Sequence, residues 1–338
     1  MQKWRYLIPA FLALLFVLIT CYSAYYYIFL VLLAANMLNW YWGEFDHREL
    51  KETLRFFYSS RQASALKSVN AVVLLAFVVW AVCYADHHIT GTGHLIGFSF
   101  AVGIFTGCFI VTLGHDLLHS GQRFQQVLSA LLFTVAGIPH FASEHLCGHH
   151  RDVGLKSDPT TAGLNEVFYT YFIKITFSNI KNIYFTQYNL PGYLRRKILY
   201  FNIGMLLLLW SVWLLIWFTA AHPAQTLFFF IAQGFTAYLL YELINYIQHY
   251  GLMRSGRNEA ITQGLAWNCY YKYTNYILFL LPLHSLHHLT THKCKTSELK
   301  NGPRMPYLYF LMILMALIPP LWFRKMNKLA IHYNTAAK

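Results

Sequence analysis

The sequence is poor in acidic residues and in charge of either sign. Only 13 of its 338 residues are Asp or Glu, and charged residues make up 12% of the chain, against 57% hydrophobic and 18% aromatic residues. Ordinary soluble domains carry about a quarter charged residues. This composition excludes an ordinary soluble domain and predicts a protein that lies in lipid.

Paired cysteines are also missing. The six cysteines are scattered, and no two of them form a Cys-x-x-Cys pair. This argues against a rubredoxin-like, zinc-ribbon or disulfide element in the chain. No small-residue cleavage site follows the first apolar run, which begins after Lys3 and Arg5, so we expect that run to remain as a membrane anchor.

Long apolar runs dominate the sequence instead. A helix needs about 20 mostly apolar residues to cross the hydrocarbon core, and lipid-exposed backbone must be helical or part of a closed barrel. We therefore expect an all-α integral membrane protein, a single membrane domain over residues 1–338 with six transmembrane helices. The expected spans are residues 6–20, 24–42, 68–85, 94–113, 201–220 and 225–245. A last apolar segment, 306–318, is too short to cross, and we expect it to lie in the interface or to dip in and return.

The basic residues lie on one side of these expected spans. All 26 Lys and Arg fall in segments on the same side as the N-terminus, and the opposite turns, near Cys21, at 86–93 and at 221–223, hold none. Because cytoplasmic loops carry the excess of Lys and Arg, we expect both termini in the cytoplasm of a bacterial cell, with the spans in its inner membrane. The net charge of +13 then reflects this topology and a headgroup-facing surface, and we expect no nucleic-acid partner.

Histidines gather on the expected cytoplasmic side, which holds 13 of the 17. Four groups stand out: HDLLH over 115–119, EHLCGHH over 144–150, QH at 248–249 and HSLHH over 284–288. Residues three and four apart share one face of a helix, so each group with this spacing is expected to aim its imidazoles at one point. The candidate ligands are His115, His119, His145, His149, His150, His249, His284, His287 and His288.

The other histidines are expected to be hydrogen-bonded structural residues. They are His47, His87, His88, His94, His140, His222 and His332, while His292 is ambiguous. The nine clustered histidines differ, because so many titratable side chains near lipid are costly unless a function keeps them there.

Ligand type alone does not identify the metal, since imidazole suits zinc, copper, iron and nickel. The number of ligands is more informative. Nine nitrogen ligands exceed what one tetrahedral zinc ion can use, but they would serve two iron ions with four or five protein ligands each and open positions for oxygen. We therefore predict a cytoplasmic di-iron site. Carboxylates that could orient its imidazoles are Asp116, Glu144, Asp152, Asp158 and Glu242.

At these motifs the chain resembles the membrane-bound alkane monooxygenase family, the alkane omega-hydroxylases, within the fatty-acid desaturase and hydroxylase superfamily. The most specific matches are EHLCGHHRDV over 144–153 with Asp158 and Pro159 after it, NYIQHYGL over 245–252, and the ending ALIPPLW over 316–322. Three spacers between the first two histidines of the second group, and the extra histidine after the last expected span, favour this branch over the acyl desaturases.

The resemblance implies a six-span fold, a non-haem di-iron centre held by the nine histidines, and hydroxylation of the terminal carbon of a medium or long alkyl chain with O2. It also implies electrons passed from NADH through a reductase and rubredoxin or a similar carrier. The chain departs from the family pattern beside the ligands. Asp-Leu-Leu separates His115 from His119, Gln248 stands where the family usually has Glu, and Leu283 and Leu286 replace polar residues.

Two other functions remain as alternatives. An acyl-lipid or fatty-acid desaturase or hydroxylase would use the same di-iron chemistry, although the spacing in the second group counts against it. A metal transporter is more remote, because transport sites usually lie near the bilayer midplane. Here the histidines lie beyond the inner helix ends, and Glu242, near one end, is the only acid within the expected spans.

Overall fold

The computed structural model describes residues 3–186, 190–289 and 299–336, and in these ranges the chain folds into helices joined by loops, with two isolated β-bridges. Five helical segments are long and apolar enough to cross a membrane, and one bent helix pair would make a sixth if it counted as a span. The five segments are Lys3–Tyr22, Arg61–His87, Thr92–Leu118, Gly192–Thr219 and Pro223–His249. The predicted all-helical fold is confirmed over the described residues, and five to six helices are candidate membrane spans by length and composition.

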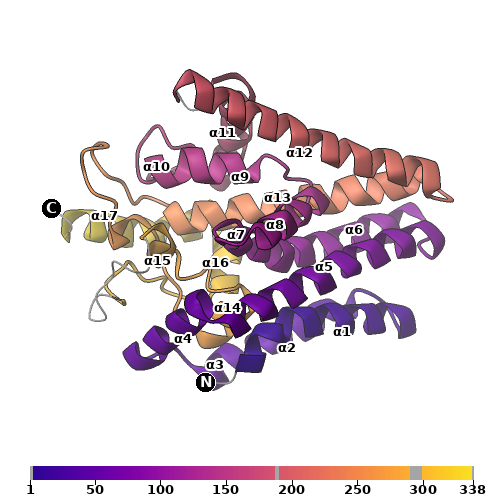
Figure 1. Cartoon of the computed structure of the whole chain (residues 1–338). Helices are drawn as coiled ribbons and strands as arrows, with labels where there is room; N and C mark the ends of the chain where they lie inside the picture. Colours follow the sequence, from indigo (N-terminus) through magenta and orange to yellow (C-terminus); the bar gives the residue numbers. More distant parts are fainter. Residues whose placement is uncertain (1–2, 187–189, 290–298, 337–338) are drawn as a thin grey trace.

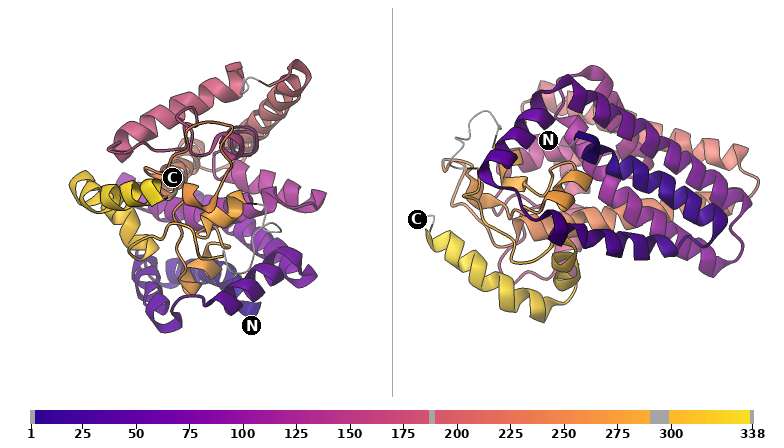
Figure 2. Two further views of the ribbon diagram at one scale, coloured as in Figure 1. Left: turned by 90° about the vertical axis from the view of Figure 1, so that its left-hand side faces the viewer. Right: turned by 90° about the horizontal axis from the view of Figure 1, so that it is seen from below.

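These segments form one bundle. They contain α1 (Ile8–Tyr22), α5 (Arg61–His87), α6 (Thr92–Phe105), the π-helical turn η2 (Thr106–Val111), α7 (Thr112–Leu118), α12 (Gly192–Thr219) and α13 (Pro223–His249). In Figure 1 the long helices run alongside one another, and the N and C labels both lie toward one end of the bundle. The two further views in Figure 2 show the same elongated arrangement end-on and from below.

Two glycines allow α6 and α13 to approach closely. A Cβ added at Gly103 would meet the Cβ of Thr236 at 2.5 Å, and one at Gly107 would lie 3.2 Å from the carbonyl oxygen of Ala237. Small residues four apart permit such contact between membrane helices. Thr106, between the two glycines, donates a 2.9 Å hydrogen bond to Gln233 of α13. These contacts fix α6 and η2 in register with α13, so α7, which continues η2, and the end of α13 bring His115 and His249 to the same end of the bundle.

The second expected span and the last apolar segment need a separate description. Residues 24–42 form α2 (Tyr27–Asn36) and α3 (Leu38–Trp42), which together are shorter than the five candidate spans. The segment 306–318 forms α16 (Tyr309–Ala316), which meets α17 (Pro319–Ala336) at an angle of 119°. Proline begins α17, because its missing N–H is unneeded in the first turn of a helix. The bend makes a straight crossing by this pair impossible.

Shorter helices surround the end of the bundle that carries the histidines. They are α4 (His47–Ser59), α8 (Arg123–Val135), α9 (Phe141–Ser143), the π-helical turn η3 (Glu144–His149), α10 (His150–Asp152), α11 (Phe168–Lys181), α14 (Lys272–Ile277) and α15 (His284–His288). Helix α8 packs on α7, where Ser129 donates a 2.6 Å hydrogen bond to the carbonyl oxygen of Gly114. Figure 1 shows α10, α15 and α17 near this end.

Asp86 fixes the opposite end of the bundle. Its carboxylate accepts hydrogen bonds from the backbone N–H groups of Ala221 at 2.8 Å and His222 at 2.7 Å, and from the hydroxyl of Thr226 at 2.9 Å. These donors precede or begin α13, where a negative charge is favourable near the helix N-terminus. Asp86 thus connects the last turn of α5 to the turn between α12 and α13.

Candidate metal centre

All nine candidate ligands converge at one end of the bundle. His115 lies on α7 and His119 directly after it, His145 and His149 on η3, His150 on α10, His249 at the end of α13, and the remaining three on α15. Their side chains form two sets of four, in each of which one ring nitrogen per histidine lies within 4.8 Å of the others. The first histidine group is His115, His119, His145 and His287, and the second histidine group is His149, His249, His284 and His288.

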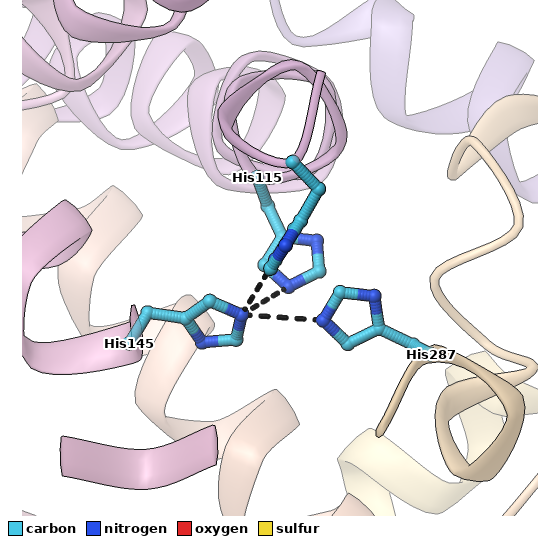
Figure 3. Close-up of side chains that lie close together, drawn as sticks. His115, His145 and His287 are labelled. Atoms are coloured by element: carbon cyan, nitrogen blue, oxygen red, sulfur yellow. Dashed lines mark hydrogen bonds between the residues drawn. The ribbon is translucent and has the colours of Figure 1, made fainter. Parts of the chain in front are cut away.

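The first histidine group is centred on the Nε2 atom of His145. This atom lies 2.9 Å from Nε2 of His115, 3.1 Å from that of His119 and 3.2 Å from that of His287. Figure 3 shows these rings pointing toward one another from three separate segments. His150 lies beside the group, with its Nε2 atom 2.9 Å from Nε2 of both His145 and His287.

The second histidine group forms a chain of close contacts. The Nε2 atom of His284 lies 2.9 Å from that of His249 and 3.1 Å from that of His288, and Nε2 of His288 lies 3.2 Å from Nε2 of His149. His149, His249 and His284 are at most 2% exposed. This group is therefore enclosed by protein on most sides.

Hydrogen bonds among the imidazoles cannot account for the first histidine group. A neutral ring nitrogen either donates one proton or accepts at one lone pair, so it makes one hydrogen bond. The Nε2 atom of His145 has four other Nε2 atoms within 3.2 Å. Several nitrogen lone pairs directed at one point are the arrangement that a metal cation stabilises. Each group therefore fits one transition-metal ion.

Five of the candidate ligands outside the bundle spans are held neutral by low pKa values. Burial and the neighbouring imidazoles shift the pKa well below its ordinary value in His145, His284, His287 and His288. Burial with the neighbouring rings lowers the pKa of His150 to about 2. Neutral imidazole is the form that binds a metal, so these ligands need lose no proton at neutral pH.

Helical spacing did not predict how the histidines divide. The sequence paired His145 with His149, four residues apart, yet they belong to different groups. The cause is local: η3 is π-helical, so residues five apart are adjacent on its surface. His145 therefore contacts His150 rather than sharing a point with His149.

Asp158 and a backbone carbonyl orient the second histidine group. The Nδ1 atom of His149 lies 3.0 Å from the Asp158 carboxylate, and Nδ1 of His249 lies 3.1 Å from the carbonyl oxygen of Leu265. Such bonds fix the ring so that Nε2 is free to bind a metal. Hydrogen bonds from His149 and Thr161 hold the pKa of Asp158 below its ordinary value despite burial. Leu265 was not predicted, because a backbone acceptor leaves no signal in residue type.

The other four carboxylates considered bind other partners. Asp116 pairs with Lys67 at 2.9 Å and Asp152 with Arg257 at 3.0 Å. Glu144 accepts a 3.1 Å hydrogen bond from Thr160, and Glu242 accepts one of 3.2 Å from Asn245. Burial raises the pKa of Glu144 well above its ordinary value, and the nearby carboxylates of Glu242 and Asp158 raise it further. These four residues support the segments that carry the ligands.

The residues that depart from the resembled family pattern are buried beside the ligands. Gln248 donates hydrogen bonds to the hydroxyl of Tyr309 at 2.9 Å and to the carbonyl oxygen of Leu281 at 3.3 Å, so it connects α13 to α16. Leu283 and Leu286 are 2% and 3% exposed on either side of His284. Neither histidine group includes any of the seven histidines expected to be structural, and His292 lies outside the described residues.

The chain is similar in sequence to several known proteins. Residues 90–294 match the fatty acid desaturase family. The chain is 32% identical to alkane 1-monooxygenase 2 of Alcanivorax borkumensis over 76% of this chain and 70% of that protein. It is 29% identical to alkane 1-monooxygenase 1 of Pseudomonas aeruginosa over 74% and 68%. It is also 32% identical to alkane 1-monooxygenase of Acinetobacter baylyi over 71% and 60%.

Proposed function

This chain belongs to the alkane 1-monooxygenase family of the fatty-acid desaturase superfamily, and on that premise we propose that it is a di-iron enzyme that hydroxylates the terminal carbon of a medium or long alkyl chain. Its relatives make it a monooxygenase acting in a membrane on a hydrophobic alkyl substrate. The proposal adds the two irons, the terminal position and a rubredoxin-type electron donor.

The observation that carries the proposal is the pair of histidine groups. Each brings four ring nitrogens within 4.8 Å of one another, and His150 adds a ninth ligand beside the first group. A second metal site is needed to use so many imidazoles, and histidine ligands with open positions suit non-haem iron. Bound there, two irons would supply the activation of O2 that no side chain can supply.

The protein's own contribution is position and enclosure. His115 and His249 lie on α7 and at the end of α13, and the segment leading into α7 packs against α13 through Gly103 of α6 and Gly107 of η2. An alkyl chain dissolved in the bilayer can therefore approach the site from the apolar side of the bundle, while electrons and protons come from the polar side. The balanced reaction places one oxygen atom of O2 in the C–H bond. The other oxygen atom is reduced to water, which consumes two protons and two electrons from the donor.

The proposed electron donor is chosen for its charge, which is opposite to that of this chain. The chain carries a net charge of +13, and its basic residues lie in the segments expected at the cytoplasmic side. A small acidic carrier such as rubredoxin would be attracted to that surface before docking. An NADH-dependent reductase would then keep the carrier reduced.

The test is product analysis with labelled oxygen. Inner membranes containing this protein are supplied with rubredoxin, its reductase, NADH and ¹⁸O2, and offered a panel of alkanes, fatty acids and acyl esters. We expect a terminal alcohol that carries one heavy oxygen atom. A parallel preparation with His149→Ala provides the inactive control. A primary alcohol without label would contradict oxygen insertion.

The same experiment also tests whether the protein is a desaturase, because the matched family is named for that reaction. An unlabelled product with a new double bond would support a desaturase. A protein that holds iron and has a working donor, but oxidises no member of the panel, would contradict both enzymatic functions. Metal uptake into vesicles would then be measured to examine transport.

A further inference from the structure

A polar cleft lies beside the first histidine group. It has a volume of about 340 Å³, and its wall includes Ser64, Lys67, Asp116, His119, Gly121 and Gln125. His119 is the only one of the nine candidate ligands in this wall. It is also the only one whose side chain is exposed, whereas the other eight are buried or half-buried.

A buried ion pair lies in the wall of the cleft. Lys67 and Asp116 are 2.9 Å apart, with side chains only 11% and 8% exposed, and both lie within candidate membrane spans. The ammonium of Lys67 also lies 3.8 Å above the ring centre of Phe57. Charged side chains within spans are costly, so they usually pair with one another and face the bundle interior or a water-filled cavity. The serine and glutamine side chains around them complete a hydrophilic wall.

No member of the second histidine group lines the cleft, although His288 is half-buried. His149, His249 and His284 are at most 2% exposed, and none of them lines the cleft. Asp158 and the carbonyl of Leu265 hold two of these rings in place. The Nδ1 atoms of His145 in the first group and of His284 and His288 in the second are buried and have no hydrogen-bond partner among the described residues. The two groups therefore differ in access to this cleft, which only the first group reaches.

We propose that this cleft is the solvent portal of the metal centre and that it serves the first histidine group. A metal held by His115, His119, His145 and His287 then exchanges with solution faster than one held by the second histidine group. The same portal admits the protons that the monooxygenase reaction consumes and releases the water that it forms. The inference rests on the proposed metal-binding function, but it concerns access and not the reaction catalysed.

Two glycines provide a matched test. Gly121 lies in the wall of the cleft, and an added Cβ there would meet no atom within 4 Å. Gly256 lines a different cleft, which contains no candidate ligand, and an added Cβ there also meets open space. Neither glycine has a positive φ, so tryptophan at either position causes no backbone strain. Gly121→Trp would narrow the portal, and Gly256→Trp is the control.

The experiment measures metal release without turnover. The full chain, loaded anaerobically with Fe²⁺ in detergent, is mixed with an excess of a water-soluble sulfonated phenanthroline, and absorbance follows the iron that the chelator removes. We expect two phases of similar amplitude. Gly121→Trp should slow the fast phase several-fold and leave the slow phase unchanged, while Gly256→Trp should alter neither. His119→Ala, which removes the exposed ligand, should abolish the fast phase and keep the slow one.

Release of iron in a single phase would overturn the portal proposal. An equal effect of Gly121→Trp and Gly256→Trp on the fast phase would also overturn it. Loss of the slow phase in His119→Ala would also overturn it. These outcomes are separate from those that test the proposed function. A protein with two release phases and the expected variant effects, yet without any oxidised product, would contradict the monooxygenase proposal and leave the portal supported.

Discussion

The Nδ1 atom of His149 lies 3.0 Å from the Oδ2 atom of Asp158, and the two side chains are 2% and 0% exposed. A buried carboxylate that accepts from Nδ1 fixes the imidazole and makes its Nε2 atom a better donor to a metal. This pair gives the second histidine group an anionic support, and it leads to the first prediction.

Replacing Asp158 with Asn should weaken metal binding in the second histidine group. Loss of such an outer carboxylate typically lowers metal affinity by about 10–100-fold. Competition with a chelator of known affinity would measure it, and we expect one of the two bound metals to be affected. Asp152→Asn is the control, since Asp152 bonds Arg257 at 3.0 Å. Equal effects of the two variants would contradict a special role for Asp158.

Single ligand replacements should remove metal from one group at a time. His149 and His287 belong to different groups, so His149→Ala and His287→Ala should each lose roughly half of the bound iron, and both should abolish activity. Both proteins should remain in the membrane fraction, because neither residue lies in a candidate span. Elemental analysis of purified protein measures this. Full iron content in either variant would show that the replaced histidine is not a ligand.

Breaking the Lys67–Asp116 pair should destabilise the protein. Lys67→Met leaves the Asp116 carboxylate buried without its partner, and such a loss typically costs about 3–5 kcal/mol. We expect a clearly lower melting temperature in detergent. The double variant Lys67→Met with Asp116→Asn should recover much of the loss, since no charge then remains buried. A double variant no more stable than Lys67→Met would argue against the ion pair as the cause.

Acid should destabilise the metal-free protein, partly through His140. Burial lowers the pKa of His140 from 6.5 to about 4 in the folded protein. Between these values the unfolded chain binds a proton that the folded chain does not, so stability falls as pH decreases from 6.5 toward 4. Melting temperatures measured across this range should fall less steeply in His140→Gln. The same slope in both proteins would show that His140 does not contribute.

Labelling of single cysteines should locate the two ends of the bundle. In a cysteine-free background, His88→Cys should react with an impermeant maleimide added outside intact cells, and Ser157→Cys should react only after the cells are opened. Both positions are exposed, and they lie near the Asp86 end and the histidine end respectively. The excess of Lys and Arg in the expected inner segments motivates this orientation. The reverse pattern would invert the topology.

The sequence by itself determined the class of the protein and its candidate ligands. Apolar runs of about 20 residues match spanning helices, whereas strands of a closed barrel need only about 10, so the helical membrane fold follows from the length of the runs. The nine histidines could be singled out because clustered imidazoles near lipid are costly. Both inferences depend on properties of short segments, which the sequence shows directly. The sequence did not predict that α2 and α3 are short. The apolar run is continuous through Met37, so it gives no sign of the break between the two helices there.

Only the tertiary structure decided how the ligands are shared. His287 and His288 are adjacent in the chain but belong to different groups, because successive side chains on a helix point in different directions. The π-helical turn η3 brings His145 against His150, which α-helical spacing does not predict. The carbonyl of Leu265 and the pairing of Lys67 with Asp116 depend on packing between segments far apart in the chain. Such contacts are set by where helix ends meet, and no local pattern in the sequence carries that information.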